Sequence, residues 1–463
     1  MRSFLRYFSS VKETTQFRFE SCRVENKSYI RLLGPDSIKF LNGLVTSKLQ
    51  PNFVKKNLTT ISTKEQEKNN TLSSLNFSKY NWGIYKECTR LEDHISRFGT
   101  YTGFLNMKGK LFTDSIIYPY PFTLKNIQDK KFPEYLMEFD SHIAQKMERT
   151  LDNHKLLSKV KFKHVQNEEL RTWDAYITMP EEYQLLENLL NPMQEMKDGE
   201  QALHFANFFA SMFFQGNEHK LKAVYFDTRL VDDMYEGKIK PMFRIITDNS
   251  VSDINDIFNC TAFGENSFEK ASIPATEIQK ERFKFGLFDG NHEYIPETLL
   301  ALEANFDYFE DSINSDKGCY VGQELTARTF ATGVLKKRCV GITIDEPQKL
   351  ADWDHSKYLS IFSKLELQVQ NQDTQAAINP FGSLSKPVKK RTRPAGQLIN
   401  YNGKIGVAVV RKDYIYHALK HHHDIDAYIE LPSKETVACS IKLEWLDRFL
   451  EETEAKEVEQ EQE

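Results

Sequence analysis

Hydrophobic and polar positions in the first 330 residues alternate with two periods, one typical of strands and one typical of helices. Alternating apolar runs bounded by turn residues predict strands at 28–33, 101–105, 110–118, 135–139, 160–165, 172–178, 224–229 and 241–246. Apolar residues three and four apart predict helices at 38–45, 142–157, 181–191, 201–214 and 278–285. Hairpins interleaved with helices favour α+β sandwich modules over a doubly wound parallel sheet.

Beyond Arg338 the pattern changes to short strand-like runs separated by turns, which predicts a small closed β-barrel. Two polar stretches, at about 51–78 and 368–394, interrupt these patterns and are interpreted as loops. We therefore expect four parts: a presequence at 1–16, an α+β region at 17–330, a C-terminal barrel at 331–449 and a disordered acidic tail at 450–463. The runs that predict the barrel strands are 339–344, 361–367, 395–400, 405–410 and 438–443.

Composition narrows the class of protein. The chain is 40% apolar and 12% aromatic, enough to bury sizeable cores, and no run approaches the ~20 apolar residues that cross a bilayer. The formal net charge is −5, but residues 451–463 hold seven glutamates and one lysine, so the rest of the chain is near neutral. A broad basic face for nucleic acid is therefore not expected. Nucleotide binding is not expected either, because the chain has no GxGxxG and no Walker A loop, and HExxH is also absent.

The first residues, MRSFLRYFSSVK, contain arginines, a lysine and serines but no acidic residue before Glu13. On a helical wheel the apolar side chains fall on one side, as in a mitochondrial transit peptide. We therefore expect a location in the mitochondrial matrix, with an ordinary N-terminus as the alternative. The six cysteines are dispersed and form no CxxC pair, which argues against a disulfide framework and against a self-contained metal site.

The most informative segment reads KGCYVGQE, from Lys317 to Glu324, and places Cys319 two residues after a lysine and next to a glycine. A nearby cation lowers a thiol's pKa, and only the thiolate is a nucleophile or metal ligand. Lys317 supplies that cation if its side chain turns toward the sulfur. Glycines at 318 and 322 leave room for another molecule to approach. The alternative is a tight glycine turn that packs a small cysteine inside.

The segment resembles the signature of the YgfZ family, relatives of the folate-dependent glycine-cleavage T-protein that serve iron–sulfur protein maturation. The resemblance spans most of residues 22–449. It includes ALEANFD at 301–307, Gly333 and the basic run 336–338, with weaker matches at residues 34, 40, 41, 106, 109, 114, 229, 244, 286, 406 and 411. It implies a cloverleaf of two α+β modules and a C-terminal antiparallel β-barrel around a central opening. With the leader, the chain is most similar to the mitochondrial branch.

The resemblance also implies a function. Members of that branch help to form [4Fe–4S] clusters with A-type ISC scaffold proteins, and the implied clients are aconitase and radical-SAM enzymes such as lipoate and biotin synthases. The chain is then an assembly factor rather than an enzyme, and Cys319 is the functional thiol that contacts a transient cluster shared with a partner. The other implied motif residues are Lys317, which would tune the thiol, Gly318, Tyr320, Gly322, Gln323, Glu324 and Arg328. We expect Gln323 and Glu324 to bond the turn or begin the next helix, and Glu324 to pair with Arg328.

In the T-protein relatives the opening holds tetrahydrofolate. Arginines and carboxylates suit that ligand, and Asp114, Arg244 and Glu303 are the candidates by position. The T-protein has an acidic pair near its first hairpin, whereas this chain has Thr113 and Asp114, so aminomethyl transfer is in doubt. A folate-dependent aminomethyltransferase or demethylase is the main alternative function.

A thiol-redox module is a third possibility and needs a resolving thiol, for which Cys339 is the nearest in sequence. Two other runs attract attention. Basic residues crowd 386–393 and are interpreted as a solvated loop, with docking of an acidic partner as the alternative. Histidines at 417 and 421–423 are interpreted as an incidental surface run, with metal binding as the alternative.

Overall fold

The computed structural model describes residues 16–51, 75–88, 92–165, 169–260, 267–363, 365 and 393–450. The chain divides into two compact units, each of which is described by itself. The first comprises Met1–Ile278, Asp289–His292 and Pro296–Gly333, and the second comprises Gln279–Phe288, Glu293–Ile295 and Val334–Glu463. The predicted leader, the acidic tail and nearly all of the loop at 368–394 lie outside the described residues.

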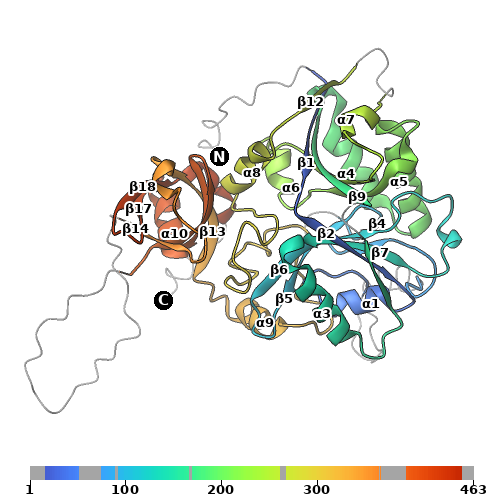
Figure 1. Ribbon diagram of the computed structural model, residues 1–463, viewed down its shortest axis with the longest axis horizontal. Helices are drawn as coiled ribbons and strands as arrows, with labels where there is room; N and C mark the ends of the chain where they lie inside the picture. Colours follow the sequence, from blue (N-terminus) through green and yellow to red (C-terminus); the bar gives the residue numbers. More distant parts are fainter. Residues whose placement is uncertain are drawn as a thin grey trace, which may run out of the picture. The chain divides into compact units, whose positions relative to one another are not determined.

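The first unit contains two five-stranded sheets (Figure 1). One sheet has the strand order β5-β6-β7-β2-β8, with bounds Thr100–Leu105, Leu111–Pro119, Glu134–Asp140, Lys27–Leu33 and Lys161–Val165. The other has the order β10-β11-β9-β1-β12, with bounds Leu221–Phe226, Met242–Asp248, Leu170–Thr178, Arg18–Val24 and Glu269–Ser272. A short ribbon pairs β3 (Ile84–Lys86) with β4 (His94–Ser96). Most neighbouring strands are antiparallel, and β1 with β12 is a parallel pair.

Helices in this unit bury apolar faces against the sheets. In α5 (Gly199–Phe213), Phe205, Phe209 and Phe213 recur every four residues and pack with β10 and β11 in one core. The apolar spacing that predicted a helix at 201–214 thus corresponds to its buried face, while Phe208 is exposed on the other side. The second core collects apolar side chains from β2, β6 and β7 with those of α1 and α3. The α-helices among the described residues, in both units, are α1 Ser37–Asn42, α3 Ala144–Lys155, α4 Leu185–Glu195, α5, α6 Val231–Tyr235, α7 Ile254–Ile257, α8 Ala275–Lys284, α9 Gln323–Thr332 and α10 Lys412–His421.

The second unit is a closed six-stranded barrel with the order β13-β16-β15-β14-β17-β18, drawn in orange and red in Figure 1. Its strands are Lys337–Ile344, Ile405–Arg411, Gly396–Asn402, Leu359–Ser363, Ile425–Glu430 and Thr436–Ile441, all paired antiparallel. The mixed α+β content and the C-terminal antiparallel barrel confirm the predicted fold class. The arrangement of modules around a central opening stays a prediction.

The structure also corrects several details. The helix predicted at 38–45 ends at Asn42. Most of the loop predicted at about 51–78 lies outside the described residues, but Leu75 and Phe77, near its end, are buried in the core with β2. The sequence pattern did not predict strands β1 and β17 or helix α10. In the part of the chain that the structure describes, no helix is long and apolar enough to span a membrane.

Candidate functional site

Cys319 lies in an exposed loop that leads into α9. We call residues 312–322 the cysteine loop. Within the described part of the chain, Cys319 makes no hydrogen bond or ion pair, and a Cβ built on Gly318 would meet no atom within 4 Å. The thiol is therefore displayed to solvent rather than packed inside, which removes the alternative of a buried structural cysteine.

The Lys317 ammonium is bonded to the backbone of the segment that follows α1. Its Nζ donates to the carbonyl oxygens of Val45, at 2.5 Å, and Ser47, at 2.6 Å, and lies 4.7 Å from the centre of the Tyr320 ring. Burial lowers the pKa of Lys317 to about 7, although the nearby Asp311 carboxylate opposes this shift. These contacts give no support to the prediction that Lys317 tunes the thiol directly.

Further bonds join the cysteine loop to the segment 43–47, which follows α1. Val321 donates its N–H to the carbonyl of Gly43 at 3.2 Å, and Asn314 donates to the carbonyl of Thr46 at 3.1 Å. The Thr46 hydroxyl donates to the carbonyl of Ser312 at 2.7 Å. The loop is thus attached on both sides of Cys319, while Cys319 itself stays free of such bonds to the described residues.

Gly322 marks where the cysteine loop meets the β5–β6 hairpin. Its φ is +77°, and a Cβ there would lie 2.4 Å from the carbonyl oxygen of Asn106 in the hairpin turn. In the same turn, a Cβ on Gly109 would lie 2.8 Å from the Cβ of Leu325. The room that sequence reasoning assigned to another molecule at Gly322 is therefore filled by the chain's own turn, whereas the room at Gly318 is open.

The remaining motif residues order the start of α9. Gln323 is its first residue, and its side-chain oxygen accepts the N–H of Tyr320 at 3.1 Å. Glu324 and Arg328 pair at 3.0 Å, but both are exposed, so the pair contributes only ~0.3–0.5 kcal/mol. The expectations that Gln323 bonds the turn and that Glu324 pairs with Arg328 are met.

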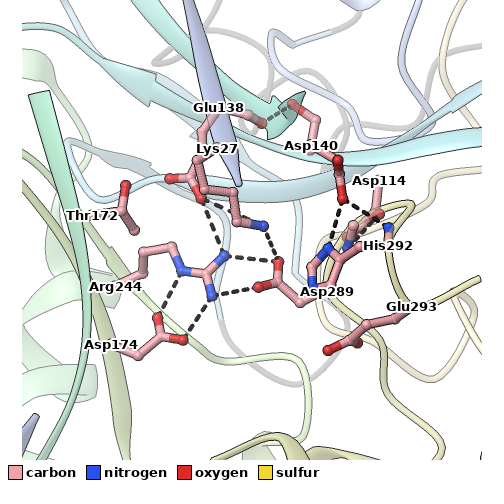
Figure 2. Close-up of polar contacts among 12 residues, drawn as sticks. Lys27, Asp114, Glu138, Asp140, Thr172, Asp174, Arg244, Asp289, His292 and Glu293 are labelled. Carbon is pink, nitrogen blue, oxygen red and sulfur yellow. Dashed lines mark hydrogen bonds and ion pairs between the residues drawn. The ribbon is translucent and has the colours of Figure 1, made fainter. Parts of the chain in front are cut away.

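Arg244 belongs to a second polar cluster, buried between the two sheets of the first unit. Its guanidinium donates to both oxygens of Asp174 (2.7 and 2.8 Å), both oxygens of Asp289 (2.8 Å each) and one oxygen of Glu138 (3.2 Å), as Figure 2 shows. A guanidinium has five N–H donors, and these five bonds use them all. Arg244 therefore has no free N–H for a ligand carboxylate.

Lys27 completes the charge pattern of this cluster by donating to Asp289 at 2.7 Å. Burial raises the pKa of Glu138, although Arg244 and Lys27 oppose the shift. Burial by itself lowers the pKa of Lys27, but the carboxylates of Asp289 and Glu138 reverse this and raise it. The two cations Arg244 and Lys27 thus face the carboxyl groups of Asp174, Asp289 and Glu138, so each buried charge has a partner of opposite sign.

Asp114 and Glu303 accept backbone hydrogen bonds. Both oxygens of Asp114 accept the N–H of Gly290 at 3.1 Å, while one oxygen of Glu303 accepts the N–H of Leu300 at 3.0 Å. Nearby, Asp140 accepts bonds from the rings and backbone N–H groups of His142 and His292. Each of the three residues predicted for a folate-like opening thus has bonds within the chain, and folate binding stays an untested prediction.

Sequence reasoning missed Lys27, Glu138, Asp174 and Asp289 as members of the buried cluster. A signal was available for two of them, because Glu138 and Asp174 each interrupt a predicted apolar strand. Single charges in fully buried strands need partners, so such interruptions indicate ion pairs. No comparable signal marks Lys27 or Asp289, which lie at a strand end and in a connection.

Other candidate chemistry is limited. All six cysteines are free, and Cys339 is buried in the barrel. The imidazoles of His417, His421 and His423 gather at the end of α10, with ring centres 4.3–6.1 Å apart. Nevertheless, among the described residues no group of three or more His, Cys, Asp or Glu side chains is arranged to hold a metal ion.

Comparison with known proteins gives close relatives. No family model matches the chain. The mitochondrial iron–sulfur cluster assembly factor IBA57 homolog of Kluyveromyces lactis is 97% identical over 462 residues, which cover 100% of each chain. The mitochondrial factor IBA57 of Saccharomyces cerevisiae is 37% identical over 438 residues, 90% of this chain and 87% of that protein. Among solved structures, glycine cleavage system aminomethyltransferase T from Bartonella henselae covers 94% of this chain and 88% of its own, with 10% identity and a TM-score of 0.46.

Proposed function

This chain belongs to the IBA57 family of mitochondrial iron–sulfur cluster assembly factors, and on that premise we propose that Cys319 is the thiol through which it handles clusters. Its thiolate is a transient ligand to an iron–sulfur cluster that a partner protein also holds. The cluster is cargo that passes through the site. The observation behind this proposal is the exposure of Cys319 in a loop attached on both sides.

The arrangement of donors supports sharing the cluster with a partner. Iron–sulfur clusters are held mostly by cysteine thiolates. Cys319 is exposed, whereas Cys22, Cys339 and Cys439 are buried and Cys88 and Cys260 are partly buried. Because no multi-residue metal site is found among the described residues, the other ligands come from the partner. A-type ISC scaffold proteins, which themselves carry clusters, suit this role.

The step that the chain supports is the joining of two [2Fe–2S] units into one [4Fe–4S] cluster. Two oxidised [2Fe–2S] units contain only ferric iron, so forming an oxidised [4Fe–4S] cluster requires two electrons from an external reductant. No described side chain is proposed to supply these electrons. The chain's own contribution is a thiolate at a fixed place while the units join. Aconitase and the lipoate and biotin synthases are the proposed clients, and the matrix is the proposed compartment.

A purified system tests the role of Cys319. The full chain is mixed with an A-type scaffold protein loaded with [2Fe–2S] cluster and a thiol reductant, and Mössbauer spectra follow formation of [4Fe–4S]. Cys319→Ser is compared with wild type, and Cys260→Ser is the control for loss of a partly exposed thiol elsewhere. We expect conversion with wild type and Cys260→Ser and little with Cys319→Ser. Equal conversion with all three would rule out the ligand role.

A further inference from the structure

We propose that Lys317 is a positioning residue: its side-chain nitrogen fastens the cysteine loop to the segment 43–47 and so fixes where Cys319 is presented. The effect of this attachment on activity rests on the proposed function of Cys319. The attachment itself can be tested independently of that function. Lys317 acts through two backbone carbonyls and not through the charge that it brings near the sulfur.

The hydrogen bonds of Lys317 connect two segments that are far apart in the sequence. Its nitrogen donates at 2.5 Å to the carbonyl of Val45 and at 2.6 Å to that of Ser47, residues some 270 positions away in the sequence. The Tyr320 ring lies 4.7 Å from the same nitrogen, within the range of a cation–π contact. A surface lysine that served only as a local charge would instead keep its ammonium in water.

Two attachments bracket Cys319. Lys317 is bonded two residues before it through a side chain, and Val321 is bonded two residues after it through its N–H to Gly43. Between them, Gly318 has no neighbouring atom within 4 Å of a Cβ position. The backbone bond of Val321 exists for any side chain at 321. On the N-terminal side, Ser312 and Asn314 are also bonded to Thr46, but the attachment nearest to the thiol depends on the identity of residue 317. The lysine of the motif therefore has a role that a cation elsewhere near the thiol cannot fill.

This attachment does not depend on the protonation state of Lys317. An ammonium has three N–H donors and a neutral amine has two, and two carbonyls need two donors. Both forms can thus hold the loop. A thiol-tuning lysine would behave differently, because only its charged form lowers the pKa of a cysteine.

The test uses the full chain with Lys317→Met, which keeps most of the side chain's length and removes its donors. Lys317→Arg restores donors at the same place. Lys108→Met is the matched control, since Lys108 is an exposed lysine in the hairpin turn that Gly322 contacts. Hydrogen–deuterium exchange of residues 313–321 reports the attachment. The pH dependence of Cys319 alkylation by iodoacetamide, followed by mass spectrometry, reports any tuning of the thiol.

We expect Lys317→Met to exchange about tenfold faster in residues 313–321, with the midpoint of the alkylation curve unchanged. Lys317→Arg should recover much of the protection, and Lys108→Met should match wild type. Unchanged exchange in Lys317→Met would overturn the proposal, as would a raised alkylation midpoint without faster exchange. If Lys317→Met does not fold, Lys317→Leu, which also lacks donors, replaces it with the same expectations. Normal function of Cys319→Ala would refute the proposed function, while the exchange data would still decide the attachment.

Discussion

Arg244 and Asp174 lie opposite each other on adjacent antiparallel strands, and their side chains form a two-point ion pair with N–O distances of 2.7 and 2.8 Å. Both side chains are buried, and strands β11 and β9 hold them in register. The pair links the core of one sheet to Glu138 in the other sheet, since the same guanidinium reaches both. The cluster therefore links the two sheets of the first unit.

Substituting Asp174 should lower the unfolding free energy more than substituting Glu138. Asp174→Asn removes an anion from a buried guanidinium, and such a loss costs ~3–5 kcal/mol of unfolding free energy. Glu138→Gln should lower it less, because Glu138 accepts only one bond from Arg244, at 3.2 Å, and glutamine keeps a side-chain oxygen for that bond. Urea unfolding of both variants at pH 7 measures the difference. Equal losses would contradict this ranking of the two carboxylates.

The two glycines of the motif should respond differently to alanine. Gly322→Ala places a Cβ against the carbonyl of Asn106 in a left-handed backbone conformation, so we expect a loss of at least ~2 kcal/mol of unfolding free energy. Gly318→Ala meets open space and should change stability by less than ~0.5 kcal/mol. Thermal unfolding of the two variants compares them directly. A similar loss at both positions would show that the loop does not pack as described.

His94 should make the protein less stable in acid. Burial lowers its pKa to about 4, and the nearby lysines reinforce this while the bond to the Glu92 carbonyl opposes it. Between pH 6.5 and 4 the unfolded chain therefore binds a proton at this residue that the folded chain does not, so stability falls as the pH falls. The expected contribution is about 2–3 kcal/mol between pH 7 and pH 4.5.

The His94 prediction has a direct check. His94→Asn keeps an N–H donor for the Glu92 carbonyl and cannot titrate. Its unfolding free energy should therefore fall less between pH 7 and pH 4.5 than that of wild type. The same exchange at exposed His204 is the control. If His94→Asn shows the full acid sensitivity of wild type, His94 is not its source.

Met107 marks the face that a partner should contact. It is 83% exposed at the tip of the hairpin whose Asn106 touches Gly322, so it lies beside the cysteine loop. Methionine is enriched in protein interfaces, so we propose that this side chain contacts the partner that shares the cluster at Cys319. Met107→Asp should weaken binding to an A-type scaffold protein by about tenfold without changing the melting temperature. Phe208→Asp, on α5 and also exposed, is the control, and equal effects would argue against this face.

Much of the fold followed from the sequence, because local pattern decides local structure where the core is apolar. The run of phenylalanines in α5 and the Asn106–Gly109 turn could be recognised from residue spacing and turn chemistry alone. Helix α10 was missed although its buried residues Tyr414, Ile415, Ala418 and Leu419 recur at helical spacing. Strand β17 was also missed, and it pairs both with its neighbour in sequence, β18, and with the distant β14, a pairing that no local pattern signals.

The site was predictable in part. The motif around Cys319 was found by resemblance, and the roles of Gln323 and Glu324 were expected. The hydrogen-bond partners of the Lys317 side chain were not expected, because they are backbone carbonyls of residues 45 and 47, which have no signature in the sequence. Likewise, the saturation of Arg244 depends on Asp289, which tertiary structure brings across from a connection. Contacts of this kind become visible only when the chain is folded.

The most direct measurement uses mitochondria that lack this chain and receive back wild type or Cys319→Ala. Aconitase activity is assayed beside that of a [2Fe–2S] enzyme. The account predicts a selective loss of aconitase activity in the deletion, restored by wild type and not by Cys319→Ala. Normal aconitase activity in the deletion, or full restoration by Cys319→Ala, would contradict a [4Fe–4S] maturation role centred on Cys319.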